Sequence, residues 1–283
     1  KEVPFRLRLI QLAADRFGFV FSNHHVLLDA WCRMGVVDEF FKVYQGLLGG
    51  QTVHLPTPPR YRDFIAWLQR WDRDASRGFW RQELAGFERP TALPFDRAPS
   101  REQAKGSVAD QLVYLSREQS AQLAQRAQAA QLTVNTLVQG AWALLLQRYS
   151  GDRDVLFGVT VAGRPVEFPE MQTTVGLFIN SIPLRVKLPG AQAGLSAKAW
   201  LKPLLEYNLN LREHEHLGLV DIQACSEIGS GQALFDSLFV FENAPVESSV
   251  GAQASSMKVK AGSSRTHTNY PITVVVYPGE VLG

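Results

Sequence analysis

The residues best suited to chemistry lie near the start of the printed sequence, where His24 and His25 precede Asp29. A neutral imidazole accepts a proton near pH 7, which makes a histidine a candidate general base. If the two histidines continue a preceding strand, they point to opposite faces of it, and only one reaches a given site. Asp29 could orient an imidazole or pair with a basic group that holds the turn. Taken without context, the cluster favours a structural role, because polar groups are common at strand ends.

Other clusters of reactive side chains give weaker signals. His214 and His216 resemble a metal-binding pair, but helical residues two apart point in widely different directions, so solvation is favoured and no metal site is expected. Cys32 and Cys225 lack a catalytic signature, and burial is the usual explanation for such thiols. The sequence has no glycine-rich phosphate loop, which argues against an ATP site on this chain.

The composition is that of an ordinary globular chain. Of its 283 residues, 46% are hydrophobic and 20% are charged, and 29 basic against 27 acidic residues leave a formal net charge of +2. A chain of this length is expected to form about two domains, and neither disorder nor a disulfide scaffold is expected. A net charge this close to zero gives no electrostatic footprint for nucleic acid or an anionic membrane, so neither is expected as a partner.

The chain is expected to work in the cytoplasm. It has two cysteines, and the start of the sequence lacks the apolar segment of a secretory signal, which together indicate a reducing compartment. The most apolar run, residues 134–146, contains Asn135 and Gln139, so it is too short and too polar to cross a bilayer. We interpret this run as a buried helix.

Hydrophobic periodicity in the first third of the chain predicts a strand pair followed by helices. The expected elements are strands at residues 5–11 and 17–22, a helix at 31–48, and two helices within 61–87 that separate near residues 76–78. Residues 90–105 are rich in proline, arginine and small polar residues and have no sustained period. They are expected to connect two domains, which we place at residues 1–95 and 96–283.

Beyond this connector, strands and helices follow one another without strict alternation. A capping-box pattern at Ser116–Gln119 indicates a helix start. The expected elements are strands at residues 109–115, 154–161, 181–187, 236–242 and 271–276, and helices at 117–130, 133–149 and 195–215. Residues 248–264, rich in glycine, alanine and serine, are expected to form a loop. This mixture predicts an α+β fold, a layered α/β sandwich.

Several sequence blocks resemble those of one known family. Residues 23–31 resemble the His-His-x-x-x-Asp-Gly signature of the condensation domains of nonribosomal peptide synthetases, which belong with the chloramphenicol acetyltransferase-like acyltransferases. Further blocks similar to that family follow in its order, at Tyr61–Trp67, Gly163–Pro165, Val175–Ser181, Glu215–Gln223 and Phe235–Asn243. Ordered agreement over nearly the whole chain is a strong signal.

The resemblance implies a fold of two acyltransferase-like lobes arranged in a V. Residues 1–95 would then be the remainder of the N-terminal lobe, with the histidine motif and connecting helices, and residues 96–283 the C-terminal lobe. The family has a substantial block before the motif and more chain after the final strand. The first lobe is therefore expected to be incomplete, and the second to be truncated at its end.

The resemblance also implies a reaction, the formation of a peptide bond between two carrier-bound groups. The amine of an aminoacyl group attacks the thioester of an acyl or peptidyl group, and the donor is expected to be L-configured. No cofactor is expected to be bound covalently to this chain, since the phosphopantetheine arms of carrier domains tether both substrates. The expected partners are donor and acceptor peptidyl carrier domains and an adjacent adenylation domain.

The family pattern assigns roles to individual residues. His25 would accept the amine proton or stabilise the tetrahedral intermediate, with His24 as a supporting residue. Asp29 would pair with Arg164 of the Gly-Arg-Pro turn and fix the loop that presents the histidine. Ala30 stands where the signature has glycine, so its Cβ would strain the backbone if that position needs a positive φ, although its N–H can still contact an oxyanion.

Two further residues are candidates for the wall of a substrate channel. The tryptophans of this chain sit at helix-core intervals, which favours packing, and Trp80 near the expected lobe junction is the one to which we assign a possible channel role. Asn180, in the block at residues 175–181, is the second candidate.

The competing interpretation is a catalytically silent module of the same fold that docks carrier domains. Retention of His25 and Asp29 argues against it, because silent versions often lose this pair. Epimerisation and cyclisation relatives are disfavoured as well. The cyclisation type replaces the two histidines with aspartate, and the motifs of the epimerisation type are not found in this sequence.

Overall fold

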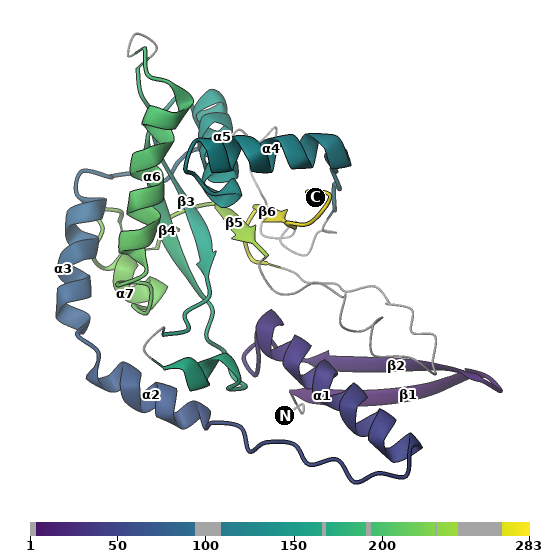
Figure 1. Cartoon of the computed structure of the whole chain (residues 1–283). Helices are drawn as coiled ribbons and strands as arrows, with labels where there is room; N and C mark the ends of the chain where they lie inside the picture. Colours follow the sequence, from purple (N-terminus) through teal and green to yellow (C-terminus); the bar gives the residue numbers. More distant parts are fainter. Residues whose placement is uncertain (1–3, 94–108, 166–167, 191–193, 230, 243–267) are drawn as a thin grey trace. The chain divides into compact units, whose positions relative to one another are not determined.

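The computed structural model describes residues 4–93, 109–165, 168–190, 194–229, 231–242 and 268–283, and these fall into two compact units (Figure 1). Of the described residues, the first unit contains 4–71, 164–165 and 168–179, and the second contains 72–93, 109–163, 180–190, 194–229, 231–242 and 268–283. The chain thus leaves the second unit after Gly163 and re-enters it at Asn180. The expected domain boundary between residues 95 and 96 lies outside the described residues and stays a prediction.

The first unit begins with a β-hairpin and continues with helices. Its elements are β1 (Phe5–Ala13), β2 (Arg16–Asn23), α1 (Ala30–Leu48), α2 (Tyr61–Arg70) and the 3-10 helix η2 (Pro169–Gln172). β1 and β2 pair in antiparallel register from Phe5 opposite Asn23 onward. Helix α1 contacts β2 where the rings of Phe19 and Phe40 stack with their centroids 5.0 Å apart.

A small aromatic core holds the rest of the first unit together. Phe64 on α2 packs against Phe178 with the ring centroids 4.6 Å apart, and Met171 completes the buried cluster. Partly buried rings surround it, contributed by Tyr61, Trp67 and Phe168. Because α2 and the segment around residues 168–178 pack together through these side chains, this core helps to fix their mutual position.

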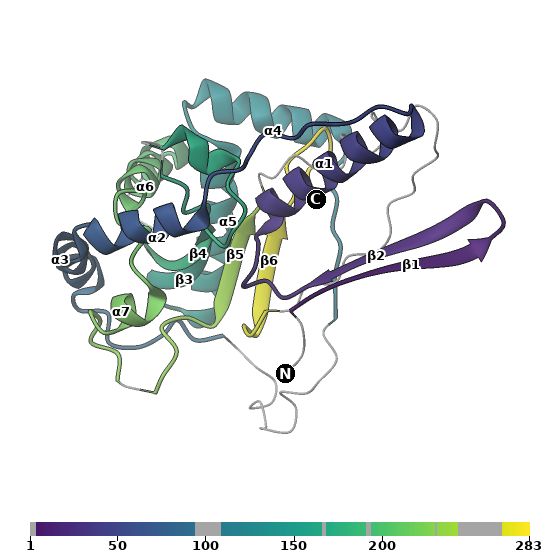
Figure 2. The same ribbon diagram turned by 90° about the horizontal axis from the view of Figure 1, so that it is seen from below.

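The second unit is a four-stranded sheet covered by helices (Figures 1 and 2). Its elements are α3 (Arg73–Leu84), α4 (Arg117–Ala129), α5 (Val134–Ser150), β3 (Asp154–Val161), β4 (Asn180–Lys187), α6 (Ala197–Leu211), α7 (Leu219–Gln223), β5 (Ser237–Phe241) and β6 (Ile272–Val276). The strand order is β4-β3-β5-β6, with β3 and β4 antiparallel and the other two pairs parallel. Helix α5 packs on β3 and α6 packs on α5.

Local sequence signals explain where these helices begin and end. The predicted capping box is confirmed, since the Ser116 hydroxyl accepts the Gln119 N–H and the Gln119 side chain accepts the Ser116 N–H. The Thr133 hydroxyl caps α5 by accepting the Thr136 N–H, and Gly151, with φ of 79°, ends it. The run at residues 134–146 is therefore a helix of the second unit, and its side chains at Gln139 and Leu146 are buried.

The structure differs from the sequence-based expectation in three places. The break between α2 and α3 lies at Trp71 and Asp72, rather than near residues 76–78, because the Asp72 carboxylate caps α3 by accepting the Asp74 and Ala75 N–H groups. The expected strand at residues 109–115 is absent, since of its backbone only the Leu115 N–H bonds another described segment, at Leu282. The helix expected to reach residue 215 ends at Leu211, because the backbone N–H groups of residues 212–214 bond carbonyls three residues earlier rather than four.

No element was predicted for η2 or α7. The other strands and helices lie close to the ranges predicted for them, and the α+β fold class is confirmed. The loop expected at residues 248–264 lies outside the described residues. None of the helices in the described part of the chain has both the length and the apolar character needed to cross a membrane.

Two glycine substitutions test the packing of the second unit with opposite signs. An alanine Cβ at Gly158, in the middle of β3, would run into the Phe235 ring, so Gly158→Ala should lower the free energy of unfolding by about 1–3 kcal/mol. Gly78 lies inside α3 with open space around its Cβ position, so Gly78→Ala should raise that free energy by about 0.5–1 kcal/mol. Urea unfolding of the purified chain measures both, and shifts of the same sign would contradict this packing.

Candidate active site

The two histidines lie in a turn that follows β2. The His24 N–H donates to the Pro4 carbonyl at 2.8 Å, which closes the end of the hairpin, and the His24 carbonyl accepts the Leu27 N–H at 3.1 Å. His24 Nδ1 accepts the Val26 N–H at 3.1 Å, so the proton of the neutral ring lies on Nε2. The histidines therefore do not continue the strand, and strand alternation does not decide which of them reaches a site. His24 stabilises the turn that carries His25.

The ring of His25, unlike that of His24, is held by no hydrogen bond to another described residue. Its side chain is exposed, and within the described ranges no hydrogen bond or ion pair restrains the imidazole. Both ring nitrogens are therefore open to a substrate group, while the backbone on either side is held by the His24 turn and by Asp29. This is the geometry that a proton acceptor needs on a fixed support.

Asp29 is the most heavily engaged residue of the motif. It is the N-cap of α1, because its Oδ1 accepts the Cys32 N–H at 2.9 Å, and its Oδ2 accepts the Phe178 N–H at 3.4 Å. Arg164 Nη2 lies 3.5 Å from the carboxylate, and the side chains of Arg164 and Asp29 are 4% and 1% exposed. The structure thus contains the ion pair expected between these two residues, and it is buried.

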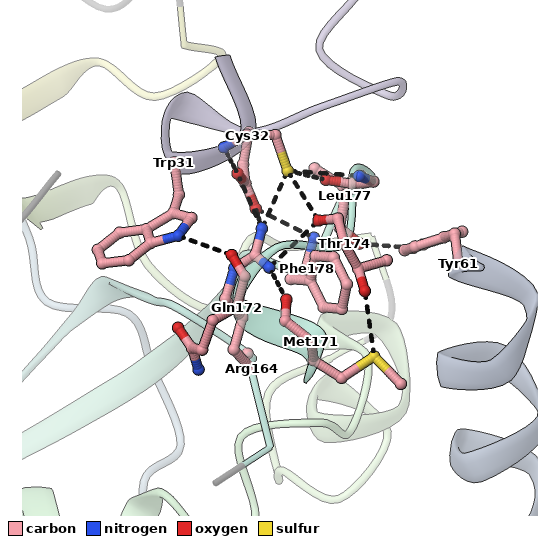
Figure 3. Close-up of polar contacts among 12 residues, drawn as sticks. Trp31, Cys32, Tyr61, Arg164, Met171, Gln172, Thr174, Leu177 and Phe178 are labelled. Carbon is pink, nitrogen blue, oxygen red and sulfur yellow. Dashed lines mark hydrogen bonds and ion pairs between the residues drawn. The ribbon is translucent and has the colours of Figure 1, made fainter. Parts of the chain in front are cut away.

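Arg164 is surrounded by acceptors from the segment that follows it (Figure 3). Its Nη1 donates to the carbonyls of Met171 and Thr174, the latter at 3.3 Å, and its guanidinium carbon lies 4.0 Å above the centre of the Phe178 ring. A buried charge is costly unless it is paired and fully hydrogen-bonded. These contacts satisfy that requirement and fold the segment around the guanidinium.

Cys32 is a member of this network that sequence reasoning left as a buried thiol without a role. Its Sγ accepts from Arg164 Nη2 at 2.9 Å and from the Gly176 N–H at 3.3 Å, and donates to the Gly176 carbonyl at 3.1 Å. Burial raises the pKa of the Cys32 thiol, so it stays protonated and acts as a donor at neutral pH. The spacing of three residues from the Asp29 cap was the available signal, because it places Cys32 on the first turn of α1.

Tyr61 and Trp31 are two further residues that the motif alone did not single out. The Tyr61 hydroxyl donates to the Leu177 carbonyl at 2.5 Å, and its ring fills the space where a side chain at Gly176 would be. The Trp31 indole N–H donates to the Gln172 carbonyl at 3.1 Å. Both residues therefore attach the segment 172–177 to the helices of the first unit.

Ala30 fits its position without strain. It is the first residue of α1, and the only non-glycine residue with a positive φ in the described part of the chain is Gln131. The Cβ that this chain has in place of the signature glycine therefore costs no left-handed backbone conformation.

The two candidates for a channel wall are both engaged inside the second unit. Trp80 is fully buried on α3, and its indole N–H donates to the His214 carbonyl at 3.3 Å, so the expected channel role is wrong and Trp80 is a core residue. Asn180 Nδ2 donates to the carbonyls of Glu215 and Leu217, each at 2.8 Å. Its amide hydrogens are both used within the fold, and a channel role for Asn180 stays a prediction.

The histidine region at residues 214–216 also has an internal role. His214 Nδ1 lies 2.8 Å from the Ser76 hydroxyl and its ring stacks on Phe79, rather than being solvated, and burial lowers the pKa of the imidazole. Glu215 is buried and its Oε1 accepts the Gly163 N–H at 3.1 Å. Burial raises the pKa of the Glu215 carboxyl to about 7. No group of three or more potential metal ligands occurs among the residues that the structure describes.

Comparison with known proteins identifies the family. Residues 1–282 match the family model described as "Condensation domain", and the chain belongs to this family. It is 40% identical over 283 residues to a linear gramicidin synthase of Brevibacillus parabrevis, covering 98% of this chain and 5% of the relative. It is 39% identical over 282 residues to chondramide synthase cmdD of Chondromyces crocatus, covering 99% of this chain and 7% of that relative. The chain thus spans a small fraction of the length of these curated relatives.

Solved structures show the same fold. The X-domain from teicoplanin biosynthesis matches with a TM-score of 0.69 and 23% identity, over 85% of this chain and 55% of that one. The SgcC5 protein from Streptomyces globisporus matches with a TM-score of 0.74 and 21% identity, over 99% of this chain and 65% of that one.

Removal of the Asp29 carboxylate should destabilise the first unit strongly. Asp29→Ala leaves the buried Arg164 without its counter-charge and removes the cap of α1, so the free energy of unfolding should fall by about 3–5 kcal/mol. Asp63→Ala is the matched control, because Asp63 is an exposed aspartate of the first unit whose pair with Arg62 contributes at most about 1 kcal/mol. Chemical denaturation of both variants makes the comparison, and equal losses would contradict a special role for Asp29.

Glu215 should make stability depend on pH. The carboxyl ionises near pH 4.5 in the unfolded chain and near pH 7 in the folded one, so the folded state holds the extra proton between these values. The free energy of unfolding should therefore fall by on the order of 3 kcal/mol as pH rises across that range, and level off above it. Glu215→Gln should remove this slope in urea unfolding between about pH 5 and pH 8, whereas the exposed Glu213→Gln should keep it. An unchanged slope in Glu215→Gln would contradict the raised pKa.

Proposed function

We propose that this chain is a catalytically competent condensation domain that forms a peptide bond in nonribosomal peptide synthesis. The observation that carries the proposal is the exposed imidazole of His25, which bonds no other described residue, on a turn fixed by His24 and Asp29. Family membership over residues 1–282 and the similarity to peptide synthases support the general reaction. A binding module alone would not require a free proton acceptor on a rigid support.

In the proposed reaction, the amine of an aminoacyl group attacks the carbonyl carbon of a thioester. His25 accepts the amine proton as the C–N bond forms, the C–S bond then breaks, and the proton passes to the departing thiolate. Both groups are tethered to carrier domains by phosphopantetheine arms, which an adjacent adenylation domain supplies with amino acids. Since an amine attacks a thioester readily, holding the two reactants in register provides most of the rate, about 7–11 kcal/mol of the barrier.

The other residues of the site fix the backbone around His25 and do not exchange protons with the substrate. Asp29 and Arg164 fix the start of α1, and His24 fixes the turn on the other side of His25. The Ala30 N–H, at the first position of α1, is the proposed contact for the developing oxyanion. An L-configured donor is part of the proposal, on the strength of the blocks at residues 215–223 and 235–243.

The second candidate is a silent module that recruits a partner. The observation that favours it is the similarity of fold to the X-domain from teicoplanin biosynthesis, of which a complex with OxyB is also known. The two candidates differ in whether the synthetase makes a carrier-bound dipeptide at this domain.

His25→Ala should reduce dipeptide formation about 10²- to 10⁴-fold in the synthetase that contains this chain, because the amine loses its proton acceptor. The product is measured by mass spectrometry of the loaded acceptor carrier. Since the His25 side chain is exposed and unbonded in the described structure, the free energy of unfolding should change by less than about 0.5 kcal/mol.

His54→Ala is the matched control, because His54 is also an exposed histidine of the first unit and lies outside the motif. It should leave dipeptide formation unchanged. If His25→Ala retains the wild-type rate, His25 is not the proton acceptor. If the unmodified synthetase binds both loaded carriers and makes no dipeptide, the silent module is the correct function.

A further inference from the structure

The segment Arg164–Ile179 is flanked at both ends by residues that bind one short stretch of the second unit. This segment belongs to the first unit, whereas the flanking residues, Gly163 and Asn180, belong to the second. The Gly163 N–H donates to the Glu215 carboxylate at 3.1 Å. The Asn180 amide donates at 2.8 Å to the carbonyls of both Glu215 and Leu217. Glu215 therefore takes part in fixing both flanking residues, through its side chain and its backbone.

The contact between Glu215 and Gly163 is buried. Glu215 is 8% exposed. The positive charge of Arg212, three residues earlier in the chain, partly offsets the effect of burial on the pKa of the Glu215 carboxyl. Burial of a carboxyl group destabilises the folded state unless the group forms hydrogen bonds. The partner here is the amide of Gly163, the glycine of the Gly-Arg-Pro turn.

Gly163 is joined by one peptide bond to Arg164, whose guanidinium is the counter-charge of Asp29. The orientation of the peptide at Gly163 affects where the backbone of Arg164 starts. The guanidinium already lies 3.5 Å from the Asp29 carboxylate, so a further displacement would break their hydrogen bonds. Asp29 in turn caps α1 by accepting the Cys32 N–H. A loss of order at Gly163 should therefore reach the first turn of α1 through Arg164 and Asp29.

We propose that Glu215 is a positioning residue, whose carboxylate fixes Gly163 and thereby supports the pairing of Arg164 with Asp29. This inference rests on the proposed function of the same site. The Gly163 N–H needs only an acceptor oxygen, so a glutamine at position 215 supplies the contact and an alanine does not.

The test compares Glu215→Ala with Glu215→Gln in the whole synthetase, by hydrogen–deuterium exchange resolved to single amides and by dipeptide formation. Glu215→Ala should speed exchange at Gly163 and at Cys32, and should lower dipeptide formation about 10- to 100-fold, as expected when a support shifts. Glu215→Gln should restore both readouts to near the wild-type values. Glu213→Ala, an exposed glutamate two residues away, is the matched control and should alter neither.

Three results would overturn the inference: unchanged exchange at Gly163 in Glu215→Ala, faster exchange at Gly163 without any change at Cys32, or a Gln variant as impaired as the Ala variant. If Glu215→Ala unfolds the domain, Glu215→Asp takes its place, because the shorter side chain withdraws the carboxylate from Gly163. If the unmodified synthetase makes no dipeptide, the proposed function fails, while the exchange at Gly163 and Cys32 still decides the role of Glu215.

Discussion

The structure of the first unit depends on one requirement, that the buried charges of Asp29 and Arg164 have partners for their polar groups. Removing two such ions from water costs several kcal/mol each, and their mutual attraction offsets this only with good additional hydrogen bonds. Here Arg164 also donates to the Met171 and Thr174 carbonyls and lies over the Phe178 ring, while Asp29 also accepts two backbone N–H groups. The pair therefore determines the conformation of the segment around it, because each of these partners must be brought within reach.

This arrangement explains why residues far apart in the sequence act as one support. A single carboxylate, Asp29, caps α1 and neutralises Arg164, so the start of the helix cannot move without disturbing the ion pair. Cys32, one turn into the helix, repeats the connection through its sulfur to Arg164 and Gly176. Tyr61 adds a third attachment at Leu177. Because several contacts share the same partners, we expect their energies to be coupled rather than additive.

Sequence reasoning predicted what depends on local patterns. Apolar periodicity and capping residues predicted α4 and β3 to within a residue or so, and the motif resemblance identified Asp29 and Arg164 as a pair. Its failures depend on tertiary context. Residues 109–115 alternate as a strand should, but only the Leu115 N–H bonds another described segment. The helical spacing of Trp80 fits either a core residue or a residue of a channel wall. Only the packing of α3 against the region of His214 distinguishes these positions.

In the proposed function, different residues of the site support the reacting group and carry out the reaction. The nitrogen that exchanges protons with a substrate must be free of bonds to the protein, whereas the backbone that supports the side chain must be held. His24 has given its Nδ1 to the Val26 N–H and so cannot offer that nitrogen to a substrate, while the ring of His25 is left free within the described structure. In the proposed function, these two adjacent histidines therefore have different roles, and the contacts of the turn, which no motif records, support that distinction. The reactivity of His25 in this view arises from what its neighbours bind and from what it leaves unbound.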